Sequence, residues 1–195
     1  MNQTPASNET KLGILDHVEL NQHEAVGLKK TWDFLLNNQS DDLDSLLINK
    51  AHKHGFDFLY EWAGKYRTTT PLVGNLEPPA PHQITELMIN LFNDLNYRTN
   101  EIDVDNLEKV VQLLAWFEHK FIVIHPYSNT NGRMGRLLTN FILLRLGYPL
   151  LDYSNRSEDR ASYIQAMHDA DNKDYERLET FIAEELSKAI KQNMS

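Results

Sequence analysis

The segment HPYSNTNGRMGR, residues 125–136, places one histidine, two asparagines and two arginines between two apolar runs. An imidazole has an unperturbed pKa of about 6.5, so His125 could take a proton from a hydroxyl near neutral pH. Arg133 and Arg136 stand three positions apart, which on a helix places them on one face. Guanidinium groups form charge-assisted, bidentate hydrogen bonds with phosphate oxygens. The segment therefore predicts a base beside an anion site, which is what phosphoryl or nucleotidyl transfer requires.

The neighbouring residues predict how the backbone would present these groups. Pro126 biases His125 away from helical geometry, so the preceding helix should stop there. Asn131-Gly132 is a turn pair that can adopt left-handed backbone angles, and Arg133 would then begin the next helix. A helix N-terminus offers unpaired N–H groups and a partial positive charge, which makes it an anion site.

Taken singly, these residues have plainer interpretations. His125 could be a structural histidine at a helix end, Asn131-Gly132 an ordinary turn, and the two arginines part of a solvated face. The combination favours a site, because polar groups flanked by apolar segments must be hydrogen-bonded or they cost stability. The GxxxxGK(S/T) pattern of Walker-type loops is absent from the chain.

HPYSNTNGRMGR closely resembles the signature of Fic-domain proteins, HxFx(D/E)(G/A)N(G/K)RxxR. The matching positions include an aromatic residue, Tyr127, in place of Phe. Further resemblance lies in FLYEWAGKYRT, similar to the segment before the family's flap, in WFEHKFIVIHP, and in the closing DRASYIQAMHDADNKDYERLETFIAEEL. The resemblance covers roughly residues 12–190 and implies an all-α, Fic-type helical bundle with one small β-hairpin flap.

The resemblance implies a protein adenylyltransferase, an enzyme that transfers AMP from ATP to a Tyr, Thr or Ser hydroxyl of a target protein and releases pyrophosphate. His125 would be the general base. Asn131 and the Gly132 amide would form the anion hole for the α- and β-phosphates. Arg133 would contact phosphate and stabilise the transition state, and Arg136 would hold the γ-phosphate. The phosphotransfer branch carries Lys at the position of Gly132, so glycine favours adenylylation.

Two positions depart from the signature. Asn129 replaces the acidic residue that would hold Mg²⁺ or Mn²⁺, and an amide oxygen lacks the charge of a carboxylate, so the affinity for the cation should fall. Thr130 replaces Gly or Ala, and its branched side chain should crowd a tight loop. These departures leave two alternatives open: a weakened or silent binding module, or an enzyme that transfers another phosphate-linked group.

The resemblance also implies partners. A target protein would dock on the flap, about Thr68 to Pro79, by main-chain hydrogen bonds. Many family members are restrained by a helix with the pattern (S/T)xxxE(G/N). Two segments here have its spacing, Thr180 to Glu184 and Ser154 to Glu158, but neither is followed by Gly or Asn. An antitoxin-like protein or a homo-oligomer could supply the restraint instead, or there could be no restraint.

The bulk composition narrows the classes of function. The formal net charge of −9 argues against binding to a nucleic-acid backbone, and no apolar run is long enough to span a membrane. The absence of cysteine and of a visible signal peptide predicts a reducing, cytoplasmic location.

Along the chain we expect a flexible N-terminal arm, residues 1–12, and a single Fic-like domain, residues 13–195. Helices are predicted from Asp16, over 41–64, from His82, over 106–124, and after the motif, with a hairpin in KYRTTTPLVGNLEPPAP. In the first helix the periodicity predicts a buried face of Leu20, Ala25, Leu28, Trp32 and Leu35. The histidines His52, His54 and His82 lack metal-site spacing and are interpreted as surface residues.

Overall fold

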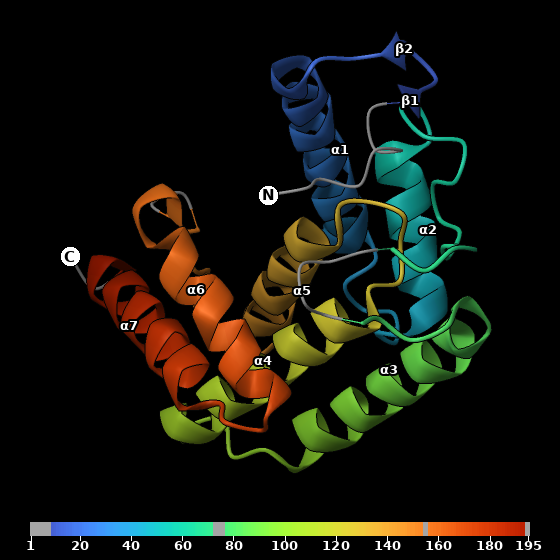
Figure 1. Cartoon of the computed structure of the whole chain (residues 1–195). Coiled ribbons are helices and arrows are strands. Elements are labelled where there is room, and N and C mark those ends of the chain that lie inside the picture. Colours follow the sequence, from blue (N-terminus) through green and yellow to red (C-terminus); the bar gives the residue numbers. More distant parts are fainter. Residues whose placement is uncertain (1–8, 72–76, 154–155, 194–195) are drawn as a thin grey trace. The chain divides into compact units, whose positions relative to one another are not determined.

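The computed structural model describes residues 9–71, 77–153 and 156–193 (Figure 1). These residues form one antiparallel hairpin, one 3₁₀ turn and seven α-helices, so the all-α prediction is confirmed. The elements are β1 (Glu9–Thr10), β2 (Gly13–Ile14), α1 (His17–Asn37), α2 (Ser45–Phe56), η2 (Pro81–Gln83), α3 (Ile84–Glu101), α4 (Leu107–Ile124), α5 (Asn131–Arg145), α6 (Arg156–Asp171) and α7 (Glu176–Asn193).

The described chain divides into two compact units. The first comprises the described parts of Met1–Asn96 with Phe121–Met134, and the second those of Tyr97–Lys120 with Gly135–Ser195. The expected single domain over residues 13–195 stays a prediction. In the first unit α1 packs along α2, and in the second α6 packs along α7 (Figure 1).

Among the described residues the one hairpin lies near the N-terminus. Glu9 pairs with Ile14 and Thr10 with Gly13, and the Lys11 amide donates to the Leu59 carbonyl at 2.9 Å. Of the predicted arm, residues 9–12 thus belong to this hairpin, and residues 1–8 lie outside the described part. The predicted flap turn, residues 72–76, is also outside it, and the flanking residues 65–71 and 77–80 contain no strand.

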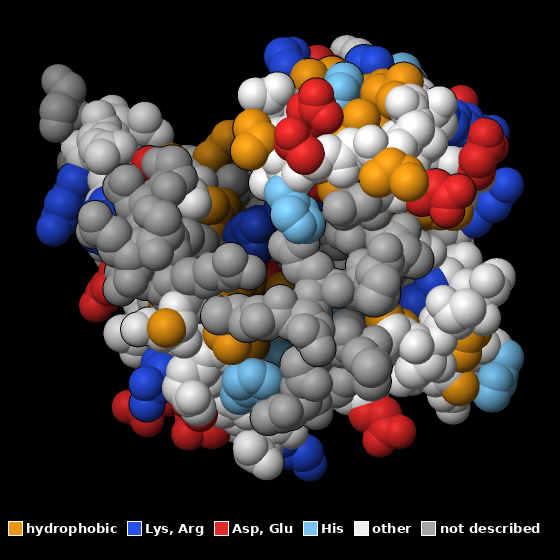
Figure 2. All heavy atoms as spheres, turned by 45° about the horizontal axis from the view of Figure 1, so that its top comes forward, with side chains coloured by type: hydrophobic (Ala, Val, Ile, Leu, Met, Phe, Trp, Pro, Cys, Tyr) orange, Lys and Arg blue, Asp and Glu red, His pale blue; other side chains and the backbone are white. Residues whose placement is uncertain are grey.

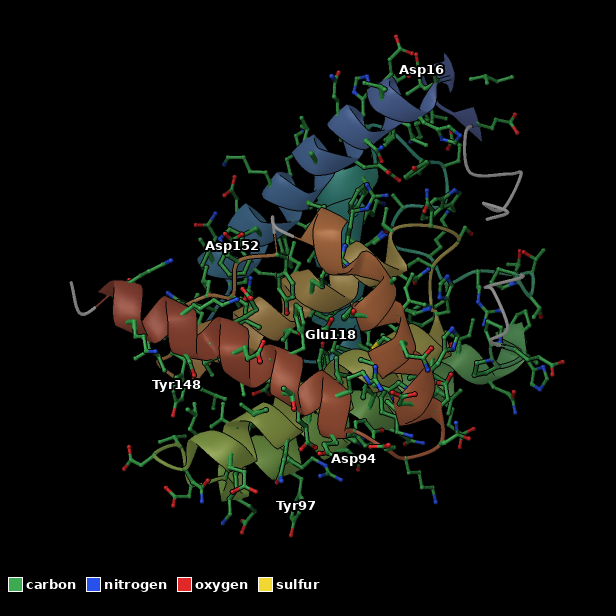
Figure 3. The ribbon with its side chains drawn as sticks, turned by 60° about the vertical axis from the view of Figure 1, so that its left-hand side comes forward. Asp16, Asp94, Tyr97, Glu118, Tyr148 and Asp152 are labelled. Atoms are coloured by element: carbon green, nitrogen blue, oxygen red, sulfur yellow. The ribbon has the colours of Figure 1, made fainter. Side chains whose placement is uncertain are left out.

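The start of α1 agrees with the sequence, but its buried face does not. The Asp16 carboxylate accepts from the amides of the first turn and forms a capping box with Glu19 (Figure 3). Leu20 and Leu35 are buried as predicted, whereas Ala25 is exposed. The other buried positions on this face are Glu24, Gly27 and Thr31.

Two glycines explain why this polar face packs so closely. A Cβ on Gly27 would lie 2.5 Å from the Phe56 ring, and one on Gly55 would lie 2.6 Å from the Gly27 carbonyl oxygen. The backbones of α1 and α2 therefore approach where neither helix has a side chain, and Glu24 is carried into the interior one turn before this crossing.

The helix α2 ends at Phe56, eight residues before the predicted end at Gly64. The chain turns after Phe56, and Gly64 has a positive φ of 74°. A Cβ on Gly64 would lie 2.6 Å from the Cβ of Lys53 and 2.8 Å from the Asn49 carbonyl oxygen, so only glycine fits. This return brings residues 57–67 back along α2 and toward the motif.

The predicted apolar face of α4 is confirmed. All its members are at most 6% exposed: Val110, Leu113, Leu114, Phe117, Phe121 and Ile124.

Figure 2 shows one face of the molecule, on which Lys and Arg side chains are interspersed with Asp and Glu side chains. No helix among the described residues is both long and apolar enough to span a bilayer.

Candidate active site

His125 follows the last residue of α4, as Pro126 predicted, and has a left-handed backbone with φ of 50°. Its Nδ1 lies 3.3 Å from the Ile122 carbonyl oxygen. A carbonyl only accepts, so the proton of the neutral ring is assigned to Nδ1, and Nε2 keeps its lone pair. Burial lowers the pKa of His125 to about 4, with a smaller lowering from Arg67. The ring is therefore neutral at pH 7 and able to accept a proton at Nε2.

The loop from Tyr127 to Asn131 is closed by one side chain. Asn131 accepts the Tyr127 amide proton at 2.8 Å and donates to the Tyr127 carbonyl at 2.7 Å. The Asn131 amide is thus used to shape the loop that ends in the first turn of α5. Its predicted contact with phosphate stays a prediction.

The left-handed residue in this loop is Thr130, with φ of 69°, and not Asn131 or Gly132. The Thr130 amide donates to Asn129 Oδ1 at 2.7 Å, which satisfies it just before α5 begins. The helix α5 therefore starts at Asn131, two residues earlier than predicted, and Gly132 lies in its first turn. The first helical bond runs from the Met134 amide to the Thr130 carbonyl, so the preceding N–H groups have no intrahelical acceptor.

The Thr130 side chain is only 4% exposed. Its hydroxyl donates to the Asn129 carbonyl at 2.6 Å and lies 3.3 Å from His52 Nε2. These two bonds hold a β-branched residue in a backbone conformation that it rarely adopts. The hydroxyl of Thr130 is thus an anchor for the loop.

His52 is buried, so its interpretation as a surface histidine was wrong, whereas His54 and His82 are exposed as predicted. The Nδ1 of His52 accepts the Gly64 amide proton at 2.9 Å, which leaves Nε2–H to donate to Thr130. The ring stacks on Tyr127 with centroids 3.8 Å apart. Burial lowers the pKa of His52 to about 3, so this imidazole is a neutral structural group.

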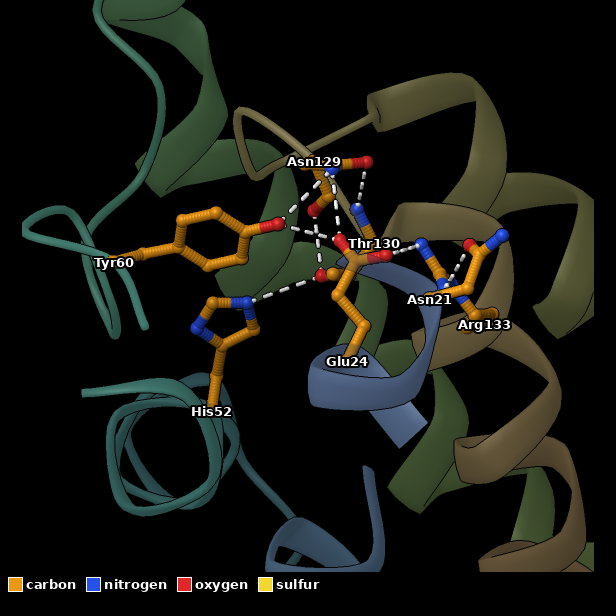
Figure 4. A network of polar contacts seen from close by, with 7 residues as sticks. All are labelled: Asn21, Glu24, His52, Tyr60, Asn129, Thr130 and Arg133. Carbon is orange, nitrogen blue, oxygen red and sulfur yellow. Dashed lines mark hydrogen bonds and ion pairs between the residues drawn. The ribbon is translucent and has the colours of Figure 1, made fainter. Parts of the chain in front are cut away.

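Glu24 is a site residue that the sequence reasoning missed. It is 1% exposed, and its carboxylate accepts from Tyr60 Oη at 2.5 Å and from Asn129 Nδ2 at 2.8 Å (Figure 4). It also forms an ion pair with Arg133. Burial and the hydrogen bond to Glu24 raise the pKa of Tyr60, so the phenol keeps its proton. The missed signal was a glutamate spaced four residues after Leu20 and three before Gly27 on one helix face.

Arg133 lies in the first turn of α5 and is half-buried. In addition to Glu24, it contacts Asn21 through Nη1 at 3.5 Å (Figure 4). A guanidinium has five N–H donors, so two such contacts leave donors for an anion.

The donor set around Asn129 does not fit a cation in this arrangement. Asn129 Oδ1 accepts from Thr130, and its Nδ2 faces Glu24 and Tyr60. The described residues contain no group of three His, Asp or Glu that could hold a metal ion. A divalent cation would therefore have to rely on ligands other than these side chains.

Arg67 is a second residue that the sequence reasoning missed. It is 3% exposed, and its guanidinium donates to four backbone carbonyls. Two of these belong to Ile124 and His125, beside the candidate base. Its signal in the sequence was an arginine placed between the β-prone Tyr66 and the run of threonines.

Arg136 lies three residues after Arg133 on α5 and belongs to the second unit. Its guanidinium is 6.0 Å from the ring centroid of Tyr153. The Tyr153 hydroxyl in turn donates to Glu118, a buried carboxylate of α4 that Figure 3 marks. Within the described residues no ion pair joins Arg136 to a carboxylate, and Glu184, one of the inhibitory candidates, is exposed on α7.

The first unit thus brings together five of the predicted site residues: His125, Asn129, Asn131, Gly132 and Arg133. Arg136 is related to them through its place on the same helix. Of the second inhibitory candidate, Ser154 lies outside the described residues.

The family model of the Fic/DOC family matches residues 42–143. The protein adenylyltransferase Fic of Nematostella vectensis is 29% identical over 193 residues, which cover 94% of this chain and 42% of that protein. The chain therefore spans less than half the length of this curated relative.

Solved structures agree on the fold. A Fic domain containing signaling protein from Bacteroides thetaiotaomicron has a TM-score of 0.71 at 22% identity, covering 87% of this chain and 69% of its own. A segment of Fic-1 from C. elegans has a TM-score of 0.70 at 23% identity, covering 92% of this chain and 52% of its own.

Proposed function

The chain belongs to the Fic/DOC family, and from this premise we propose that it transfers AMP from ATP to a hydroxyl side chain of a target protein. The observation that carries the proposal is the neutral His125 with a free Nε2, presented at the end of α4 and followed within one short loop by the N-terminus of α5. This arrangement offers a proton acceptor beside N–H groups and a guanidinium.

The transfer uses His125 as the base. Nε2 takes the proton of the target hydroxyl as its oxygen bonds to the α-phosphorus of ATP. The bond from the α-phosphorus to the bridging oxygen breaks, and pyrophosphate leaves with that electron pair. A base must be unprotonated before the reaction, and burial keeps His125 in that state.

Charge on the phosphates is balanced by the start of α5. The unpaired amides of the first turn, including that of Gly132, and the helix dipole favour an anion. Arg133 adds a guanidinium whose orientation is set by Glu24 and Asn21. Arg136 is assigned to the γ-phosphate, for which it has no competing carboxylate among the described residues.

The remaining requirements are parts of the same proposal. ATP is the co-substrate, and Mg²⁺ or Mn²⁺ would accompany it weakly, because Asn129 supplies no carboxylate. The target would dock on the segment from Thr68 to Pro79. Three further expectations stay predictions. They are a restraint by an antitoxin-like protein or a homo-oligomer, the absence of nucleic-acid and membrane partners, and a cytoplasmic location.

The direct test incubates the purified protein with ATP labelled on the α-phosphate and with candidate target proteins. We expect label in a protein band with the native chain and none with His125→Ala. His82→Ala is the matched control, because His82 is exposed and should be dispensable. Unchanged labelling with His125→Ala would remove His125 as the base. Competition by other nucleoside triphosphates in this assay identifies the transferred group.

A second candidate function is a catalytically silent module with the same fold. The ion pair between Glu24 and Arg133 favours it, because it occupies one of the two arginines that would hold phosphate. Calorimetry with ATP separates the two candidates. Heat that is lost in Arg136→Ala supports the enzyme, and the absence of such heat supports the silent module.

A further inference from the structure

Arg67 binds the turn that presents His125. Its Nε donates to the His125 carbonyl at 2.7 Å and its Nη2 to the Ile124 carbonyl at 3.3 Å. The backbone amide of Arg67 donates to the Pro126 carbonyl at 2.9 Å. Arg67 therefore binds the carbonyls of three consecutive residues, of which His125 is the middle one.

The same guanidinium binds the segment on which a target is expected to dock. Nη1 donates to the Thr69 carbonyl at 2.8 Å, and Nη2 donates to the Pro79 carbonyl at 2.6 Å. Thr69 and Pro79 are ten residues apart in the sequence. One side chain thus joins both ends of this segment to each other and to the turn at His125.

The charge of Arg67 is balanced without a carboxylate. Among the described residues no ion pair involves Arg67, and its acceptors are neutral carbonyls. Two of these carbonyls, at Ile124 and His125, lie at the C-terminal end of α4, where the helix dipole favours a cation. Lysine could not replace this pattern, because its point charge lacks the planar fork that reaches four acceptors.

The backbone at His125 requires such support. A residue other than glycine held at φ of 50° is strained and persists only when its surroundings fix it. The hydrogen bonds from Arg67 to the carbonyls of His125 and Pro126 act directly on this peptide geometry. Because the imidazole is attached to this backbone, its direction depends on the same bonds.

We propose that Arg67 is a positioning residue that holds His125 and the two ends of the segment from Thr69 to Pro79 as one assembly. A target hydroxyl bound beside Thr69 and Pro79 would then meet Nε2 at a fixed place. The part of this inference that concerns target transfer rests on the proposed function. The coupling between the segment and the base is a property of the fold.

The test compares Arg67→Gln and Arg67→Lys with the native chain, and uses Lys65→Gln as the matched control. Lys65 is exposed two residues before Arg67, and its replacement also removes one positive charge. The pKa of His125 is measured by NMR titration, and the exchange of amide hydrogens in residues 65–80 by mass spectrometry. Neither measurement requires catalytic activity.

In Arg67→Gln we expect the pKa of His125 to rise from about 4 toward 6.5, since burial and the Arg67 charge both lower it in the native chain. Amide exchange should accelerate in residues 65–80. Arg67→Lys should keep the charge yet show the same faster exchange, because the fork is lost. Lys65→Gln should match the native chain in both measurements.

With a target identified by labelling, kcat/KM should fall about 10- to 100-fold in Arg67→Lys, while the KM for ATP stays within about twofold. The proposal would be overturned if Arg67→Gln kept both the pKa of His125 and the rate of amide exchange in residues 65–80 at the values of the native chain. A shifted titration and faster exchange with no AMP transfer in any variant would uphold the role of Arg67 and reject the proposed function.

Discussion

The side-chain amide of Asn129 donates to the carboxylate of Glu24 across 2.8 Å, so an amide and not an acid is what this position accommodates. The Fic signature has an acidic residue here. In this chain the carboxylate at that point comes from Glu24 on α1, a helix more than 90 residues earlier in the sequence. The departure at Asn129 is therefore matched by another residue of the same site.

Asn129→Asp should place two carboxylates within hydrogen-bonding distance, and one must then take up a proton. Because the folded variant holds this proton and the unfolded chain releases it above the ordinary range of carboxylates, the loss of stability grows as pH rises. We expect a free energy of unfolding lower by about 1–3 kcal/mol at pH 7, and a smaller loss at pH 5. Urea denaturation at both pH values measures this.

The control for that substitution is Ser128→Asp, which adds the same charge at an exposed neighbour. The double variant Asn129→Asp with Glu24→Gln should recover most of the lost stability, because it restores one amide and one carboxylate. If Asn129→Asp lowered the free energy of unfolding equally with and without Glu24→Gln, the contact between Asn129 and Glu24 would be contradicted.

Glu24→Gln and Tyr60→Phe should be strongly non-additive. Tyr60→Phe removes the hydrogen bond between the phenol and the carboxylate, and Glu24→Gln removes the charge of its acceptor; a bond to a charged group contributes about 1.5–3 kcal/mol. A double-mutant cycle by urea denaturation at pH 7 measures the coupling. Additive losses would show that the two side chains do not interact in solution.

The burial of His52 predicts a pH-dependent stability. Its pKa falls from 6.5 to about 3 on folding. At a pH between these two values the unfolded chain therefore binds a proton at His52 that the folded chain does not bind. Stability is fully present above pH 6.5 and is lost as pH falls toward 3, by up to about 1.4 kcal/mol for each pH unit. His52→Gln, which can accept from Gly64 and donate to Thr130, should flatten this slope in urea titrations, whereas the exposed His54→Gln should leave it unchanged.

The rate of AMP transfer should fall on the acid side with a midpoint well below 6.5. In the proposed transfer His125 acts in its neutral form, and burial lowers its pKa to about 4. Measurement of kcat/KM between pH 4 and pH 8 provides the test. An acid limb centred at 6.5 would mean that the imidazole of His125 is solvated and would contradict its burial.

The sequence correctly predicted the features that are determined by residues close to one another in the chain. Asp16 fixes the start of α1, the apolar face of α4 is fully buried, and Pro126 ends α4 at the residue before His125. The motif residues could be assigned by pattern because they lie within twelve positions. Each of these predictions depended on neighbours in the chain.

The missed features all depend on contacts distant in sequence. Glu24 is buried because α1 and α2 cross at Gly27 and Gly55, and periodicity alone preferred the apolar Ala25 and Leu28. His52 is buried because the chain returns at Gly64. Thr130 adopts a left-handed conformation because His52 and Asn129 bind its hydroxyl, whereas intrinsic preference pointed to Asn131-Gly132.

The carboxylate of Glu24 lies outside residues 42–143, the stretch by which the family is recognised. A fragment trimmed to that stretch would keep every residue of the motif and lose the anion that faces Arg133. The positive charge of Arg133 is therefore paired with a carboxylate from outside the stretch that the family model matches. A portion of the chain that keeps the ion pair of Arg133 must include α1.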